Sequence, residues 1–398
     1  MTFLSLALVA VVALAGPLLA MPATWRLPVV LGELLAGVVI GQSGLSLVDP
    51  HDSSFVLLAD IGFALIMFVA GTHVPFRDAA IRSALGRGGV RAGLAAVLSA
   101  GLGTAIAWAF GTAHAPMYVV LIASSSAALI LPIIDSLRLG GPEVLAMTAQ
   151  VAIADIAAIV ALPLAINPAN AGPAALGAAL VAGCAVGLFF VLRWLEGAGI
   201  RGRVHRLSER RKFALELRIQ LAILFGLAGL ATLGHVSIML AGFSFGLTVA
   251  AVGEPRRLAR QLFALTEGFL GPLFFVWLGA SLNLRDLGSH PQMVLLGLCL
   301  GAGTMVAHGA LRIIGMPMSL GVLSCAQLGV PVAAATIGTQ QGLLLPGEAA
   351  ALILGALVTI AASTLAGSRA ARSFELPASP AGPAGLAGPA AGNRPAAA

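Results

Sequence analysis

One acidic residue, Asp155, lies in the middle of the long apolar run TAQVAIADIAAIVAL, with no basic residue within two helical turns of it. An isolated carboxylate inside a membrane is costly, so it needs either a function or a partner on another helix. Such a carboxyl can hold a proton and give it up when a cation arrives, because either one neutralises the same charge. We therefore expect Asp155 to carry a proton or a cation. The structural alternative is a protonated Asp155 bonded to a neighbouring helix.

A second ionisable side chain, His308, also falls within an apolar run. Because an imidazole changes charge near physiological pH, His308 could be a second titrating group or an ion partner for Asp155. A lone His on an apolar helix is more often a packing residue, and both interpretations stay open. Four acids nearer the ends of apolar runs fit gating or inter-helix hydrogen bonds better than a central site: Glu33, Asp60, Glu216 and Glu267.

Small polar residues occur with a proline in two other apolar runs. One run holds Ser124, Ser125, Ser126 and Pro132, and the other holds Ser324, Gln327, Gly329 and Pro331. Proline removes a backbone hydrogen bond and clashes with the preceding turn, so a helix tends to break or kink there. Two broken helices at matched positions of a membrane protein point to an ion site lined by freed backbone groups. Two simple kinks are the alternative.

Oxygen ligands for a monovalent cation are available around Asp155 in this scheme. Thr148 precedes Asp155 by seven residues, so on a helix its hydroxyl faces nearly the same way, whereas Gln150 points about 140° away. We expect a cation held by Asp155 to be completed by oxygens of broken-helix carbonyls, water and four candidate side chains: Ser125, Ser126, Thr148 and Gln327.

The composition requires a membrane for these residues. The chain of 398 residues is 59% hydrophobic and 10% charged, against roughly 25% charged residues in a soluble domain. A spanning helix needs about 20 mainly apolar residues, and thirteen runs qualify: 3–20, 27–46, 55–74, 90–110, 116–134, 144–164, 173–192, 213–233, 236–252, 261–282, 293–315, 318–340 and 347–368. The sequence thus predicts an all-α polytopic membrane protein with thirteen transmembrane helices.

The basic residues indicate an orientation. Nearly all of the 22 arginines and lysines fall in alternate gaps between the runs, and the opposite gaps hold only Arg285. Because basic residues favour the cytoplasmic side, we place the N-terminus outside and the C-terminus inside. Scattered in short gaps, these residues form no continuous basic face for nucleic acid. Residues 369–398 are rich in Pro and Ala and are expected to be disordered.

Two stretches of the chain are alike. Gly71 is followed six residues later by Arg77 and Asp78, and Gly279 is followed likewise by Arg285 and Asp286. The serine- and proline-containing runs also correspond, and a shift of seven helices turns the second copy upside down. Chance recurrence of Gly, Phe and Ser is the alternative. We predict inverted repeats at 1–164 and 213–368, joined by a linker helix and a basic loop at 165–212, as in secondary transporters.

These stretches together resemble the second family of monovalent cation:proton antiporters, which includes Kef-type and bacterial sodium/proton exchangers. The likeness is carried by LPVVLGELLAGVVIGQSGL, GFALIMFVAG, the serines near 125, IADIAAI and LFFVWLGASLNL. The resemblance implies a dimerisation domain and a core domain in which two broken helices cross beside an essential Asp. By position Asp155 resembles that Asp, Ser126 the hydroxyl of the first broken helix, and Gln327 falls in the second. The resemblance also implies an elevator-like transport cycle, in which the core domain moves up and down against the dimerisation domain.

Three departures from the resembled family matter. Residue 154 is Ala where relatives usually carry Asn, Gln or Asp, and the single lysine, Lys212, lies in a loop instead of a helix. His308 is the nearest counterpart of the missing membrane lysine. No nucleotide-binding domain follows the last apolar run within this sequence, so gating through such a domain is not expected unless another chain supplies it.

The sequence therefore predicts a secondary transporter, not an enzyme, that exchanges Na+ or K+ for H+ as a homodimer in the bacterial cytoplasmic membrane. No phosphate-binding loop, metal cluster or nucleophilic triad is present, so no cofactor is expected. If Asp155 alone titrates, one proton exchanges for one cation, and this electroneutral cycle is favoured over a two-proton cycle involving His308. The alternatives are a sodium-coupled organic anion symporter on a similar scaffold and a channel-like potassium efflux protein.

Overall fold

The computed structural model describes residues 1–21, 29–72, 79–168, 171–199, 213–234, 236–253 and 256–374, and every regular element in these ranges is a helix. Nine helices there are long and apolar enough to cross a membrane: Phe3–Ala20, Ser53–Thr72, Ser83–Phe110, Pro142–Ile166, Ala171–Gly197, Leu215–Leu233, Gln261–Ser281, Pro291–Ile314 and Glu348–Phe374. Three shorter apolar helices span Val29–Ile40, Ala115–Leu131 and Ile238–Val252. The all-α polytopic class is confirmed, and the number of thirteen crossings stays a prediction.

Several predictions fall on other parts of the chain. Arg26, Arg77 and Asp78, the basic stretch 201–212 and residues 375–398 of the Pro/Ala-rich tail lie outside the described residues.

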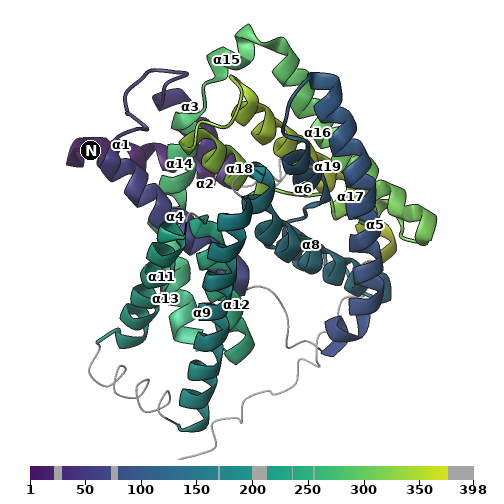
Figure 1. The fold of residues 1–398 in the computed structure, drawn as a ribbon, viewed down its shortest axis with the longest axis horizontal. Coiled ribbons are helices and arrows are strands. Elements are labelled where there is room, and N and C mark those ends of the chain that lie inside the picture. The colour runs from purple at the N-terminus through teal and green to yellow at the C-terminus, as the bar shows by residue number, and fades with distance from the viewer. Residues whose placement is uncertain are drawn as a thin grey trace, which may run out of the picture.

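The helices pack as two groups, which Figure 1 shows side by side. The first, called the scaffold group, comprises α1 (Phe3–Ala13), α2 (Ala15–Ala20), α3 (Val29–Ile40), α4 (Ser53–Thr72), α9 (Ala171–Gly197), α11 (Leu215–Leu233), α12 (Ile238–Val252), α13 (Arg256–Leu265), the π-helical turn η2 (Thr266–Leu270) and α14 (Gly271–Ser281). The second, called the core group, comprises α5 (Ala79–Phe110), α6 (Ala115–Ala123), α7 (Ala127–Ser136), α8 (Pro142–Ile166), α16 (Pro291–Gly309), η3 (Ala310–Ile314), α17 (Met318–Leu323), α18 (Gly329–Gln340) and α19 (Glu348–Phe374). The short helix α15 (Leu284–Ser289) connects α14 of the scaffold group to α16 of the core group.

Two matching glycine contacts hold the scaffold group together. A Cβ added at Gly246 of α12 would lie 2.1 Å from the carbonyl oxygen of Phe68 and 2.9 Å from the Cα of Gly71, on α4. A Cβ added at Gly279 of α14 would lie 2.1 Å from the carbonyl oxygen of Leu34 on α3 and 3.0 Å from the Cα of Gly37. Both helix pairs therefore pack backbone to backbone, as small residues allow in membranes. Gly71 and Gly279 are the matched positions of the predicted repeat, which itself stays a prediction.

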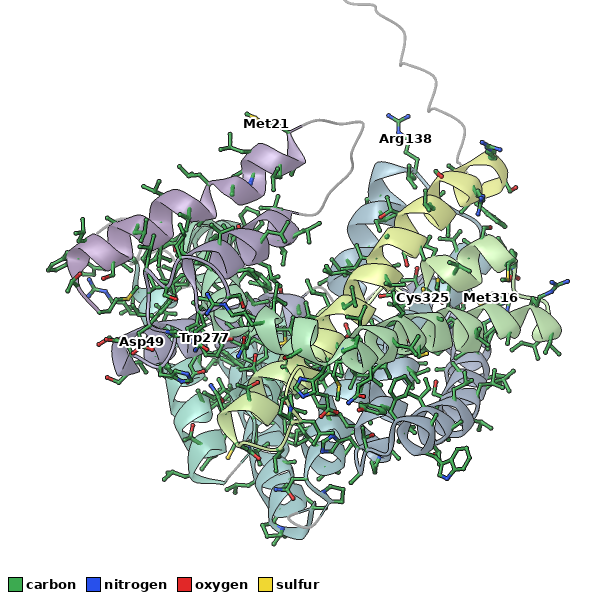
Figure 2. The ribbon with its side chains drawn as sticks, turned by 90° about the horizontal axis from the view of Figure 1, so that it is seen from above. Met21, Asp49, Arg138, Trp277, Met316 and Cys325 are labelled. Carbon is green, nitrogen blue, oxygen red and sulfur yellow. The ribbon has the colours of Figure 1, made fainter. Side chains whose placement is uncertain are left out.

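A hydrogen bond from α14 reinforces one end of the scaffold group. The indole Nε1 of Trp277 donates to the carbonyl oxygen of Pro50 at 2.9 Å. In Figure 2, Trp277 lies next to Asp49, while Cys325, in the segment between α17 and α18, lies in the other group.

Two helices of the core group are interrupted. The first break separates α6 from α7 at Ser124–Ser126, and the second separates α17 from α18 at Ser324–Leu328. The breaks precede the prolines that were expected to cause them. Pro331 lies in the first turn of α18, where a missing N–H costs no helical bond, and Pro132 lies inside α7. The serine segments, and not the prolines, mark where the backbone leaves the helix.

Candidate functional site

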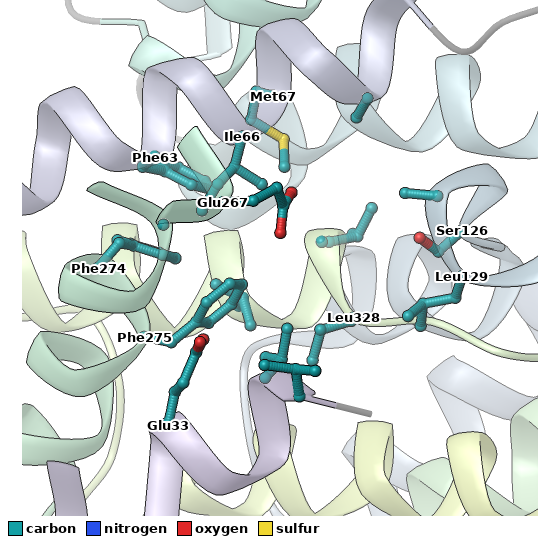
Figure 3. A pocket seen from close by; sticks show the side chains of 18 of the residues that line it. Glu33, Phe63, Ile66, Met67, Ser126, Leu129, Glu267, Phe274, Phe275 and Leu328 are labelled. Atoms are coloured by element: carbon teal, nitrogen blue, oxygen red, sulfur yellow. The ribbon is translucent and has the colours of Figure 1, made fainter. Parts of the chain in front are cut away.

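A cavity of about 230 Å³ lies between the scaffold group and the core group. The scaffold side contributes mainly apolar side chains of α4 and α14, including Phe63, Met67 and Phe275. The core side contributes Asp155 of α8 and Ser126 at the first break. Figure 3 shows the labelled side chains of both groups pointing into this space. The cavity thus places one acid of the core group against a wall formed by the other group.

The side chain of Asp155, on α8, is bonded to the N-terminal end of α7, the second half of the first interrupted helix. Its side chain is 6% exposed, and its Oδ2 atom accepts a hydrogen bond of 3.0 Å from the backbone N–H of Ala127, the first residue of α7. The positive end of a helix dipole favours an anion, so α7 stabilises the charged carboxylate. Among the described residues this is the one hydrogen bond that the Asp155 side chain forms. A carboxylate with one fixed oxygen and a face on a cavity can take up a proton or a cation at the other.

The two interrupted segments cross and bond to each other. The backbone N–H of Ser126 donates to the carbonyl oxygen of Ala326 at 2.8 Å. The hydroxyl of Ser125 donates to the carbonyl oxygen of Ser324 at 2.7 Å. Ser126 lines the cavity, whereas the Ser125 hydroxyl is used in the crossing. Of these two hydroxyls, that of Ser126 is therefore the better placed to bind a cation in the cavity.

Gln327 lies in the crossing and braces it. The hydroxyl of Ser124 donates to the Oε1 atom of Gln327, and the Nε2 atom of Gln327 donates to the hydroxyl of Thr304 at 3.2 Å. Its side chain is 3% exposed and is not among the cavity-lining residues. This amide joins α16 to both interrupted segments, and its predicted contact with a cation stays a prediction.

His308 also connects α16 to the crossing. Its Nδ1 atom lies 3.2 Å from the hydroxyl of Ser324, and its Nε2 atom lies 3.3 Å from the carbonyl oxygen of Ile122. The side chain is fully buried and does not line the cavity with Asp155. This placement matches the packing interpretation of His308 more closely than direct contact with an ion at Asp155.

The two polar side chains that precede Asp155 on α8 differ in direction, as helical spacing predicts. Thr148 donates its hydroxyl to the carbonyl oxygen of Val144 at 2.9 Å, on its own helix, and does not line the cavity. Gln150 instead reaches the second break, where its Nε2 atom donates to the hydroxyl of Ser324 at 3.4 Å. Of the predicted ligands, the structure thus brings Asp155 and Ser126 to one cavity, while Ser125, Thr148 and Gln327 bond elsewhere.

Two acids that the sequence placed away from the centre also line the cavity. They are Glu33 of α3 and Glu267 of η2, both on the scaffold side. Each lies near the end of its apolar run, so the sequence favoured gating or inter-helix hydrogen bonds for them. Only the packing of α3 against α14 brings them to the same cavity as Asp155.

Comparison with known proteins gives a consistent result. Residues 7–368 match the family model described as "Sodium/hydrogen exchanger, transmembrane". The chain is 25% identical over 384 residues to the Bacillus subtilis protein named "Putative Na(+)/H(+) antiporter YjbQ", covering 89% of this chain and 61% of that protein. It is 25% identical over 344 residues to "Probable Na(+)/H(+) antiporter 3" of Methanocaldococcus jannaschii, covering 80% of this chain and 84% of that protein.

A solved structure shares the fold. The sodium proton antiporter MjNhaP1 of Methanocaldococcus jannaschii superposes with a TM-score of 0.64 at 16% identity, over 94% of this chain and 99% of that chain. The chain spans about three fifths of the length of the Bacillus subtilis relative.

Proposed function

The chain belongs to the sodium/hydrogen exchanger family, whose members are transporters and not enzymes, and we propose that it exchanges Na+ or K+ for H+ with Asp155 as the shared carrier. The observation that carries this proposal is the position of Asp155. Its carboxylate faces the cavity between the two helix groups and is fixed by the N–H of Ala127 beside the crossing of the interrupted helices.

Exchange follows from competition for one carboxylate. A proton and a monovalent cation each neutralise the same charge, and their joint binding would leave a net positive charge in a buried site. Asp155 therefore holds one or the other, which couples the two fluxes at one proton per cation. The hydroxyl of Ser126 is the second proposed contact for the cation, because it shares the cavity. Water and backbone carbonyls complete the oxygen set.

Alternating access is proposed to arise from movement of the core group against the scaffold group, in an elevator-like manner. The location of the cavity between the groups supports this, since a relative shift would carry Asp155 along that wall. We further propose a homodimer in the bacterial cytoplasmic membrane, with the N-terminus outside and the C-terminus inside. The C-terminal end of α9 and the N-terminal end of α5 lie at one edge of Figure 1 and α15 at the other, which fits this orientation.

Reconstitution into liposomes that contain a pH-sensitive dye tests the proposal. Adding Na+, K+ or Li+ separately to proteoliposomes with an acidic interior is expected to alkalinise the interior for at least one cation. The substitution Asp155→Asn keeps the shape of the side chain, removes its charge and should abolish the signal.

Asp135→Asn is the matched control, because Asp135 lies on α7 but is exposed, away from the cavity. It is expected to keep the rate of the unmodified chain. Exchange that survives Asp155→Asn would refute the carrier role, and currents that need no proton gradient would instead indicate a channel.

A further inference from the structure

The cavity that holds Asp155 also contains two acids that the proposed exchange does not use. Glu33 comes from α3, Glu267 comes from η2, and both stand on the scaffold wall. Figure 3 shows their carboxyl groups directed into the space that Ser126 and Leu328 border from the other side. Both acids thus border the same cavity as Asp155.

Glu33 is the more informative of the two. Its side chain is 4% exposed, and within the described part of the chain no hydrogen bond to its carboxyl group is formed. A largely buried carboxyl that receives no hydrogen bond from the protein is costly to keep charged. Glu267 is a second acid close enough for its negative charge to repel that of Glu33. The protein thus maintains an uncompensated acid aimed into the cavity.

A bound cation would remove this cost. Two carboxyl groups on one wall attract a positive ion, and the ion in turn relieves their mutual repulsion. In the described part of the chain, no three His, Cys, Asp or Glu side chains are close enough to hold one metal ion together, so Asp155 does not form a single site with these two acids. The scaffold acids and the core acid are separate positions in one cavity.

The backbone at Glu267 is also unusual. Thr266–Leu270 forms a π-helical turn between α13 and α14. Such turns often occur at functional sites, because the extra residue per turn redirects side chains. Here the turn lies where the acid meets the cavity, which fits a positioned group.

We propose that Glu33 and Glu267 form a scaffold-side binding site for the exchanged monovalent cation, which rests there before it passes to Asp155. This inference rests on the proposed exchange function. The site raises the concentration of cations beside Asp155 and takes no part in the competition with the proton there. Its loss should therefore weaken the apparent affinity for the cation and leave the maximal rate nearly intact, whereas the loss of Asp155 stops exchange.

Transport kinetics provide the first test. E33Q and E267Q should each raise the apparent KM for the cation roughly tenfold, the lower limit of electrostatic focusing in a charged cleft. The maximal rate should change less than about twofold, and the KM difference should shrink at high ionic strength because salt screens the attraction. Glu33→Asp keeps the charge and is expected to restore most of the affinity.

Glu196→Gln is the matched control, because Glu196 is an exposed acid on α9 outside the cavity. It should leave KM unchanged. An unaltered KM in both E33Q and E267Q would overturn the inference, as would a loss of maximal rate with KM unchanged.

Equilibrium binding separates this inference from the exchange proposal. Purified Asp155→Asn protein should still bind Na+ saturably in isothermal titration calorimetry, and adding E33Q to it should abolish that binding. No saturable binding by Asp155→Asn, or binding that persists after E33Q is added, would contradict the scaffold site. Failure of the unmodified chain to exchange ions would contradict the exchange proposal alone, because the binding test does not depend on transport.

Discussion

The Nε2 atom of His308 lies 3.3 Å from the carbonyl oxygen of Ile122, on the last full turn of α6. A carbonyl oxygen only accepts hydrogen bonds, so the ring proton must be on Nε2 in this arrangement. Nδ1 lies 3.2 Å from the hydroxyl oxygen of Ser324, whose own proton is donated to the carbonyl oxygen of Gly321 at 2.8 Å. One imidazole thereby links α16 to the end of α6 and to the end of α17.

This arrangement predicts that His308 supports the crossing and does not carry a transported proton. His308→Ala should lower stability by about 1–3 kcal/mol, the cost of leaving buried polar partners unpaired, and slow exchange. The proton-to-cation ratio should stay at one, because His308 is outside the cavity. The ratio is measured from Na+/H+ exchange in proteoliposomes, by comparing the rates at zero and at a large negative membrane potential. Clear voltage dependence of the unmodified chain, lost in His308→Ala, would contradict the prediction.

The proposed competition between proton and cation at Asp155 predicts a specific pH dependence. As the pH falls, protons occupy the carboxylate and exclude the cation, so the apparent KM for the cation should rise. Where the proton-bound form dominates, each pH unit should raise it about tenfold, because linkage between exclusive ligands is reciprocal. In the same pH range the maximal rate at saturating cation should not change, because the carrier returns fully protonated. Initial rates at several pH values, with equal pH on both sides, give KM and maximal rate; a constant KM with a changing maximal rate would exclude simple competition.

The glycine contacts of the scaffold group predict a difference in stability between two Gly→Ala substitutions. Gly246→Ala places a methyl group 2.1 Å from the carbonyl oxygen of Phe68, so α12 and α4 must separate. We expect a loss of about 1–3 kcal/mol, typical of overpacking. Gly226→Ala, on α11, meets no atom within 4 Å and should be neutral or slightly stabilising. The stabilities of the two variants are compared by their apparent melting temperatures in one detergent. Equal melting temperatures would show that the close contact at Gly246 does not contribute to stability.

The sequence predicted the membrane architecture well because hydrocarbon imposes strict rules on it. The long apolar runs coincide with helices, and the matched Gly71 and Gly279 form matched contacts with Gly246 and Gly37. Asp155 became the candidate carrier because one charged residue in a long apolar run is costly, and that role stays a proposal. These inferences needed only local composition and spacing.

Other features depended on contacts between distant segments. The positions of the breaks could not be read from the prolines. Pro331 lies in the first turn of α18, where a proline is tolerated, and Pro132 lies inside α7, so both breaks come before the prolines. Thr148 shares a helical face with Asp155, but its hydroxyl bonds to its own helix. Glu33 and Glu267 became site candidates only when the packing of α3 against α14 placed them on one wall.

The size of the cavity bears on how the ion is chosen. A volume of about 230 Å³ exceeds that of a bare monovalent ion and has room for several water molecules, each of which occupies about 30 Å³ in the liquid. An ion can therefore enter with much of its hydration shell, and the wall cannot sieve Li+, Na+ and K+ by diameter. With Asp155 as the proposed carrier, we expect discrimination at the last step, where water is exchanged for the oxygens beside that carboxylate. Selectivity should then follow the cost of dehydration at the carboxylate, and changes to the apolar wall should alter it little.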